Sequence, residues 1–172
     1  MRRVGVIIGS DSDLDQCFLG LNFLKEAEKA GAIKADPVIT ASIHRNTLDV
    51  LDLLGKYNVD VWIIGAGAAN HLTGVCEAFL RYAIKNDKTA VIGVAFESSD
   101  KEKSLAAKLG ITQVPDTQTV FNNFIGENGF FFACEFAVFG KFPRITLKNP
   151  KPIIRRTLDA ALDEAKTRRS QK

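Results

Sequence analysis

Apolar and polar positions follow one repeated order along the first hundred residues of the chain. A short apolar run is followed by a polar or glycine-rich stretch, and then by apolar residues at helical spacing. The apolar runs are rich in β-branched residues, which favour strands. They lie at residues 3–8, 35–40, 59–67 and 89–96. Continuous apolar strands that alternate with helices indicate right-handed βαβ units and a parallel sheet covered on both faces.

Helices are predicted after the first three of these strands, because the apolar residues recur every three or four positions. In the first helix, Asp13 reads as the N-cap and Gln16 as its capping-box partner, and the helix should continue to Gly31. The expected core-facing positions of the three helices are Leu14, Phe18, Leu21 and Leu24, then Leu51, Leu54 and Tyr57, then Val75, Phe79 and Ala83.

The last third of the chain is less regular. Residues 99–110 have a helical pattern, and residues 117–121 are a candidate fifth strand. Residues 129–140 carry phenylalanines nearly all around a helix, which predicts deep burial or a place in a subunit interface. A further amphipathic helix is predicted from Pro152 to about Arg169. Its apolar stripe comprises Ile154, Leu158, Ala161, Leu162 and Ala165.

Composition is that of an ordinary globular protein, with 46% hydrophobic and 25% charged residues among 172. This length predicts a single domain over residues 1–172. No leader pattern and no run of about 18 apolar residues is present, so a cytoplasmic protein without a membrane segment is expected. The three cysteines, Cys17, Cys76 and Cys134, are odd in number and widely spaced, which indicates packed thiols. With two histidines and no H-E-x-x-H motif, a structural metal is not expected.

Charge is unevenly distributed along the chain. Residues 1–140 hold 13 basic and 17 acidic side chains, a net charge of −4, whereas residues 141–172 hold 10 basic and 3 acidic ones, a net charge of +7. A basic tail can bind nucleic acid or another polyanion. However, the tail has no aromatic residue after Phe142 on which a base could stack. We therefore interpret it as a solvated helix face, and do not expect nucleic acid to be a partner.

Three polar or glycine-rich loops follow three successive predicted strands, at residues 9–13, 42–46 and 65–74. In an open parallel sheet, ligands bind outside the carboxyl ends of the strands, where the strand order reverses. The three loops should therefore converge on one site although they are far apart in the sequence.

The first and third loops each allow a structural and a functional interpretation. Ser10 and Ser12 place hydroxyls beside a helix N-terminus, where an anion is favoured, and Asp13 can accept hydrogen bonds from sugar hydroxyls. The stretch could equally be a capped turn. The glycines and small residues at 65–74 leave room for a ligand and its anion, but they also suit tight helix–strand packing. Asn70 and His71 could be no more than a helix cap.

The second loop carries the clearest chemistry, in His44 and Arg45. Arginine can hold a phosphate through two hydrogen bonds. Histidine has an unperturbed pKa of about 6.5, which suits proton transfer near neutral pH. The alternative is a solvated surface pair, but both residues follow a predicted strand end, where binding residues concentrate.

Taken together, the three loops resemble a known family. The motifs G-S-x-S-D, S-x-H-R and G-A-G-x-A-x-H-L-x-G occur in the order and spacing of the aminoimidazole ribonucleotide carboxylases of purine synthesis, the PurE family, whose bacterial form is the N5-carboxyaminoimidazole ribonucleotide mutase. The similarity covers about residues 3–140, including residues 91–94 and, more loosely, residues 113–120.

The resemblance implies a flavodoxin-like, doubly wound parallel sheet in a three-layer α/β/α sandwich. It also implies a homo-octamer with C-terminal segments packed across subunits, here the basic helix within 150–172, a ribonucleotide substrate and no cofactor. His44 maps to the acid/base that moves protons while carbon dioxide leaves the carbamate and is captured by the ring carbon. The residues expected to bind substrate are Ser10, Asp11, Ser12, Asp13, Ser42, Arg45, Gly65, Ala66, Gly67, Ala68, His71 and Leu72.

Several positions depart from the family pattern. Leu14 replaces a tryptophan, Ile43 an alanine and Ala95 a proline, and Asn46-Thr47 replaces T-P. Direct carboxylases of the family typically carry lysine at the position of Arg45, so Arg45 favours the mutase. The alternatives are a direct carboxylase, a carboxylase of another nucleotide, and a nucleotide-binding protein without catalysis. The second alternative, a carboxylase of another nucleotide, is suggested by three residues that differ from the family pattern and are expected near the pocket for the base: Asn70, Thr73 and Phe130.

Overall fold

A computed structural model describes residues 1–114 and 120–171. Their core is a five-stranded, all-parallel sheet with the order β2-β1-β3-β4-β5. This is the flavodoxin-like, doubly wound order, so the predicted fold class is confirmed. The strands are β1 (Arg2–Ile8), β2 (Ile33–Thr40), β3 (Val61–Ala66), β4 (Ala90–Ala95) and β5 (Val120–Ile125).

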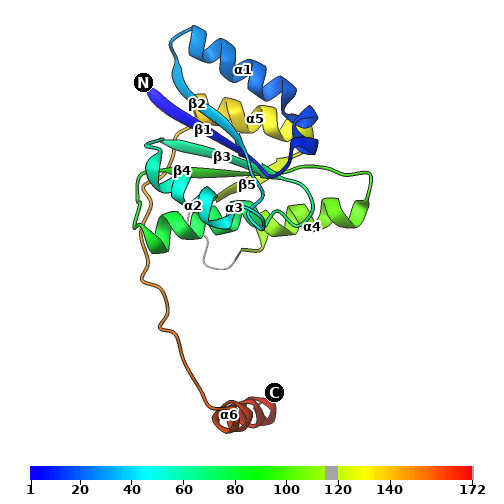
Figure 1. Cartoon of the computed structure of the whole chain (residues 1–172), viewed down its shortest axis with the longest axis vertical. Coiled ribbons are helices and arrows are strands. Elements are labelled where there is room, and N and C mark those ends of the chain that lie inside the picture. The colour runs from blue at the N-terminus through cyan, green and yellow to red at the C-terminus, as the bar shows by residue number, and fades with distance from the viewer. Residues whose placement is uncertain (115–119, 172) are drawn as a thin grey trace.

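Helices cover both faces of the sheet (Figure 1). α1 (Phe18–Lys29) and α5 (Gly126–Phe139) pack together on one face. The other face carries α2 (Thr47–Lys56), α3 (His71–Ala78) and α4 (Lys101–Thr112). Successive side chains of a strand point to opposite faces, so Ile8 packs under α1 and α5 whereas Ile7 packs against the α2 and α3 side. The result is the predicted three-layer arrangement.

The four strands predicted from apolar runs are confirmed, each to within two residues at either end. Of the candidate fifth strand, residues 117–119 lie outside the described residues, and β5 continues to Ile125. The predicted helix at 99–110 corresponds to α4.

The predicted start of the first helix is wrong. The chain forms two short 3₁₀ turns, Asp11–Asp13 and Asp15–Cys17, before α1 begins at Phe18. Ser10 caps the first turn, its hydroxyl accepting a hydrogen bond from Ser12 N at 3.3 Å, so Asp13 is not the N-cap. Phe18, expected in the core, is 66% exposed, whereas Leu21 and Leu24 of the same predicted face pack in the core.

The predicted face of the third helix is wrong at two of its three positions. Val75 and Ala83 are exposed, whereas Phe79 packs against the core. The fully buried apolar positions are Leu72, Cys76 and Leu80. After α3 the chain continues in a π-helical turn, Phe79–Ala83. The segment is apolar on several sides, so helical spacing alone fits two faces equally well.

The two C-terminal helices differ from each other in burial. In α5, Phe130 is fully buried, whereas Phe132 and Phe139 are exposed, so the helix covers the sheet with one side only. The last helix, α6 (Leu158–Ser170), begins six residues later than predicted, because Thr157 provides the N-cap by accepting a hydrogen bond from Ala160 N at 3.3 Å. It lies apart from the sheet at the end of an extended segment (Figure 1).

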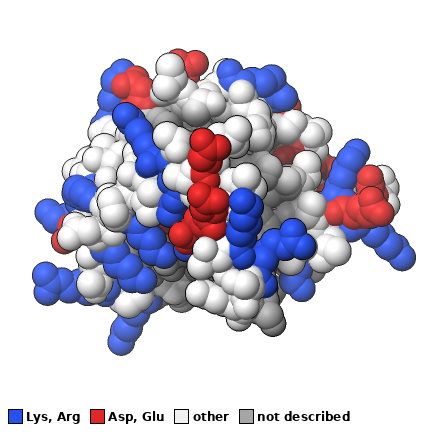
Figure 2. Space-filling model, turned by 90° about the horizontal axis from the view of Figure 1, so that it is seen from below, with Lys and Arg blue, Asp and Glu red and all other residues white. Residues whose placement is uncertain are grey.

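Basic side chains are spread around the face of the molecule on the side of α6, with a smaller acidic group near its centre (Figure 2). Within residues 1–114 and 120–171, no helix is long and apolar enough to cross a membrane. The three cysteines are buried and form no disulfide, and burial raises the pKa of the Cys17 and Cys76 thiols to about 12.

The N-terminal strand is fixed to the end of α5 by Arg2. Its guanidinium donates hydrogen bonds to the carbonyl oxygens of Ala137 (2.7 Å), Val138 (3.0 Å) and Gly140 (3.0 Å). The same group lies 4.9 Å from the ring centroid of Phe142. These contacts satisfy carbonyl groups that the end of a helix leaves without partners.

Candidate functional site

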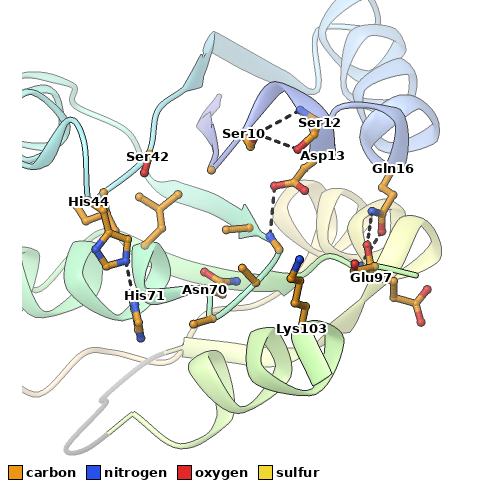
Figure 3. Close-up of a pocket in the computed structure, with 18 of the residues that line it drawn as sticks. Ser10, Ser12, Asp13, Gln16, Ser42, His44, Asn70, His71, Glu97 and Lys103 are labelled. Atoms are coloured by element: carbon orange, nitrogen blue, oxygen red, sulfur yellow. Dashed lines mark hydrogen bonds between the residues drawn. The ribbon is translucent and has the colours of Figure 1, made fainter. Parts of the chain in front are cut away.

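A cavity of about 630 Å³ lies at the carboxyl ends of β1, β2, β3 and β4. The three predicted loops meet there, as expected for the reversal of strand order between β1 and β3 (Figure 3). The lining residues are Gly9, Ser10, Ser12, Asp13, Asp15, Gln16, Ser42, Ile43, His44, Arg45, Ala66, Gly67, Ala68, Ala69, Asn70, His71, Leu72, Glu97, Ser98 and Lys103.

Backbone hydrogen bonds extend the parallel pattern of the sheet into these loops. Gly9 N donates to Gly65 O at 2.8 Å, and Phe96 N donates to Ala66 O at 3.1 Å. A Cβ atom at Gly9 would lie 2.6 Å from Ala66 Cβ. The first and third loops can therefore approach this closely only with glycine at position 9.

The first loop is joined to the third through Asp13. Its Oδ2 accepts a hydrogen bond from Gly67 N at 3.2 Å. Burial raises the pKa of this carboxyl, Asp15 raises it further, and the bond from Gly67 opposes them. Ser10 and Ser12 lie at the cavity wall with their hydroxyl oxygens 2.9 Å apart. The loop thus presents two hydroxyls beside a partly buried carboxylate.

The second loop is a turn that places His44 and Arg45 at the cavity. Ser42 O accepts hydrogen bonds from Arg45 N at 3.1 Å and Asn46 N at 2.8 Å. Ile43, one of the departures from the family pattern, is buried against the α2 and α3 side of the core. Its burial anchors the turn, and the next two side chains, His44 and Arg45, are exposed at the cavity.

His44 is hydrogen-bonded to the other histidine of the chain. Its Nε2 lies 3.0 Å from His71 Nδ1, and the two rings meet edge to face at 77°. One ring must donate and the other must accept this hydrogen bond. Two imidazoles, each of which can donate or accept a proton, are therefore hydrogen-bonded to each other at the cavity.

The Asn70 side chain fixes the conformation of the third loop. From its residue type alone, asparagine at this position could either cap a helix or bind substrate. Asn70 is 2% exposed, and its Nδ2 donates to Val94 O at 2.8 Å. Its Oδ1 accepts from Thr73 N at 3.3 Å, so it is the N-cap of α3. Both Ala68 (φ 50°) and Asn70 (φ 40°) adopt left-handed backbone conformations. Such strained conformations persist where surrounding contacts hold them, often at functional sites.

Two residues predicted to bind substrate do not line the cavity. Asp11 is exposed in the first 3₁₀ turn. Gly65 lies inside β3, where a Cβ atom would come within 2.5 Å of the Phe96 ring. The other predicted positions, His44 included, all contribute to the wall.

Two residues that differ from the family pattern, and that were expected near the pocket for the base, do not line the cavity either. Thr73 is fully buried, with its hydroxyl 3.1 Å from Ile64 O. Phe130 packs in the core between Phe96 and Gly20. Of the three departures that suggested a changed substrate, only Asn70 reaches the cavity, and its side-chain amide holds the loop together.

Sequence reasoning missed the wall formed by Asp15, Gln16, Glu97, Ser98 and Lys103. The amide of Gln16 donates to Glu97 O at 3.0 Å and accepts from Glu97 N at 2.9 Å, which joins the first loop to the end of β4. Glu97 and Ser98 directly follow the fourth predicted strand, so the strand-end rule could have found them. Lys103 gave no such signal, because it lies within a helix.

No group of three or more histidine, cysteine, aspartate or glutamate side chains within residues 1–114 and 120–171 is arranged to hold a metal ion. The side chains that line the cavity could supply acid–base chemistry by the histidines and binding of an anion by hydroxyls, amides and two cations.

Comparisons with known proteins agree with this fold. A family model described as AIR carboxylase matches residues 3–138. The crystal structure of Treponema denticola PurE is similar, with a TM-score of 0.57 and 19% identity over 80% of this chain and 81% of that one. A PurE2 variant from the same organism gives a TM-score of 0.57 and 20% identity over 81% and 82%. No curated protein matches the chain by sequence.

Proposed function

The chain belongs to the AIR carboxylase family, and from this premise we propose that it interconverts N5-carboxyaminoimidazole ribonucleotide and 4-carboxy-5-aminoimidazole ribonucleotide in purine synthesis. The observation that carries the proposal is the joint position of His44, Arg45 and the serines of the first loop around one cavity. Arg45 at the position where direct carboxylases of the family typically carry lysine favours the mutase.

The phosphate is bound at the end of the cavity formed by the first and second loops. Arg45 offers two parallel N–H donors, which match phosphate oxygens. Ser10, Ser12 and Ser42 offer hydroxyls around the same opening. Asp13 lies beside them as an acceptor for ribose hydroxyls.

His44 moves the protons of the carboxylate shift. When the carbamate N–C bond breaks, carbon dioxide leaves and the exocyclic amino nitrogen takes a proton from the imidazole. The ring carbon C4 then attacks the carbon dioxide to form the new C–C bond, and the imidazole removes the proton that C4 carried. The proton count balances, so no outside acid or base is consumed. His71 lies where it can steady either protonation state of His44.

The third loop holds the carbon dioxide between the two steps. Ala66, Gly67, Ala68 and Ala69 form a wall of small side chains. Such a wall keeps the reacting carbon close to the ring and limits the access of water, which raises the effective concentration of the reactant.

We propose further that the protein assembles as a cytoplasmic homo-octamer, with residues 150–172 packed on a neighbouring subunit. In support, the apolar residues of α6 have no cover within the described chain: Leu158 is 85% and Leu162 52% exposed. Light scattering of the full chain and of a chain ending before residue 150 tests this. A smaller assembly for the shortened chain is expected, and an unchanged mass contradicts the packing.

The direct test of the function is the rate at which the purified chain converts each carboxylated nucleotide into the other. A parallel assay with aminoimidazole ribonucleotide and bicarbonate separates the mutase from a direct carboxylase. Turnover in the first assay is expected. Binding of these nucleotides without turnover in either assay would instead support a protein that only binds nucleotides.

A further inference from the structure

Lys103 places a second cation at the cavity, away from the second loop. It lies in the first turn of α4, and its ammonium points toward the ends of the first and third loops (Figure 3). Arg45 contributes the other cation in the lining. The two therefore come from different elements, the turn after β2 and the helix after β4.

The ammonium of Lys103 is available to a ligand. Among the described residues its ion pair is with Asp100, at 3.9 Å, which is too long for a hydrogen bond. The Oδ1 atom of Asp100 caps α4 by accepting from Glu102 N at 2.9 Å, and its Oδ2 atom is the one that lies 3.9 Å from the ammonium. The Glu97 carboxylate is directed elsewhere, because its Oε2 lies beside Gly126 at the start of α5. Nothing in the described chain therefore holds this ammonium closely.

The two cations correspond to the two anions of a carboxylated ribonucleotide. The planar fork of arginine suits a phosphate, and the point charge of lysine suits a single carboxylate. Lys103 lies on the side of the third loop, whose small residues leave space for the transferred group. We propose that Lys103 binds the carboxylate that is transferred, and thereby makes the site select carboxylated over uncarboxylated nucleotides. This role rests on the proposed function and names a residue that specifies its substrate.

The charge has a predictable effect on the reaction. An ammonium beside the carboxylate stabilises the carboxylated nucleotides, in which the negative charge is present. It gives much less stabilisation to the state in which neutral carbon dioxide has separated from the ring. Lys103 should therefore favour retention of the carboxyl group and reduce escape of carbon dioxide from the cavity.

The test compares Lys103→Met with Lys101→Met in the full chain, using calorimetric titration with aminoimidazole ribonucleotide and with its 4-carboxylated form. Lys101 is the matched control, because it is an exposed lysine in the same helical turn that does not line the cavity. Loss of a charged hydrogen-bond partner should weaken binding of the carboxylated nucleotide by about 10- to 100-fold. Binding of the uncarboxylated nucleotide should change by less than about 3-fold, because it lacks the group that the ammonium would hold.

Each result has one interpretation. Loss of affinity for the carboxylated nucleotide alone, with Lys101→Met unchanged and Lys103→Arg retaining affinity, supports the proposal. Equal losses for both nucleotides overturn it, because Lys103 would then hold a group that they share, and unchanged affinities overturn it as well. If the unaltered chain binds neither nucleotide, the proposed function fails and the role of Lys103 fails with it.

Discussion

The Nε2 atom of His44 lies 3.0 Å from the Nδ1 atom of His71. This contact joins two loops that are 27 residues apart in the sequence and reach the cavity from different strands. It fixes the ring of His44 and requires that only one of the two nitrogens carries the shared proton in the neutral pair. A change at His71 should therefore alter the orientation of His44.

Replacing His44 by asparagine should remove the acid–base step and leave the fold intact. The expected loss in kcat is roughly 10²- to 10⁴-fold, the usual contribution of a positioned proton-transfer group. The measurement is the steady-state conversion of either carboxylated nucleotide. Because the side chain is exposed, thermal unfolding should be unchanged and serves as the control. A loss of only a few-fold would remove His44 from the role assigned to it.

Replacing His71 by phenylalanine should lower kcat and leave KM nearly unchanged. The ring shape is retained while the hydrogen bond to His44 is lost, so substrate binding should persist and orientation of His44 should not. A rise in KM with an unchanged kcat would indicate that His71 binds substrate and does not act through His44.

Asp13→Asn should raise thermal stability at neutral pH. Burial raises the pKa of Asp13 above the ordinary value of 3.8, so the folded chain binds this proton more tightly than the unfolded chain. The stability that the protonated carboxyl contributes is complete below the unfolded pKa and is lost as pH rises through the folded pKa. Asparagine avoids this loss and can still accept the bond from Gly67.

The measurement is Tm of both proteins between neutral pH and pH 3.8. The difference should be largest at neutral pH and should shrink as the pH falls. The variant should also bind nucleotide less tightly, if Asp13 accepts from the ribose. An unaltered chain that is the more stable of the two at neutral pH would contradict the argument.

Arg2→Met should destabilise the fold by about 1–3 kcal/mol, because several carbonyl groups at the end of α5 lose a charged donor. Methionine keeps an apolar stem next to Phe142, so the loss reports mainly on the hydrogen bonds. Denaturant unfolding measures the change. Lys25→Met, at an exposed position of α1, is the control and should have no effect.

Much of the fold could be predicted because strands buried on both faces are continuous apolar runs. The convergence of the three loops followed from the order of strands and helices, which was enough to bring His44 and Arg45 to one cavity. The helix faces were harder. Phe18 and Val75 fit a helical period, yet both are exposed, whereas Gly20 in α1 and Cys76 in α3 are buried.

Side-chain roles inside the site could not be predicted from residue type. Asn70 and Thr73 suggested a changed base pocket, yet they hold the third loop and the start of α3. Conversely, Lys103 had no motif, since its place at the cavity depends on how α4 packs beside the third loop. A Cβ at Gly110 of α4 would overlap the carbonyl oxygen of Ala69, which shows how closely helix and loop approach.

The paired hydrogen bonds between Gln16 and the backbone of Glu97 also bear on how the molecule folds. They connect positions 81 residues apart, and Glu97 follows β4, which pairs with β3. Closing so long a loop carries an entropic cost that must be met before the contact can stabilise the chain. The cavity should therefore be among the last parts to become ordered, and a partly folded chain with a formed β1–β3 pair should not yet bind nucleotide.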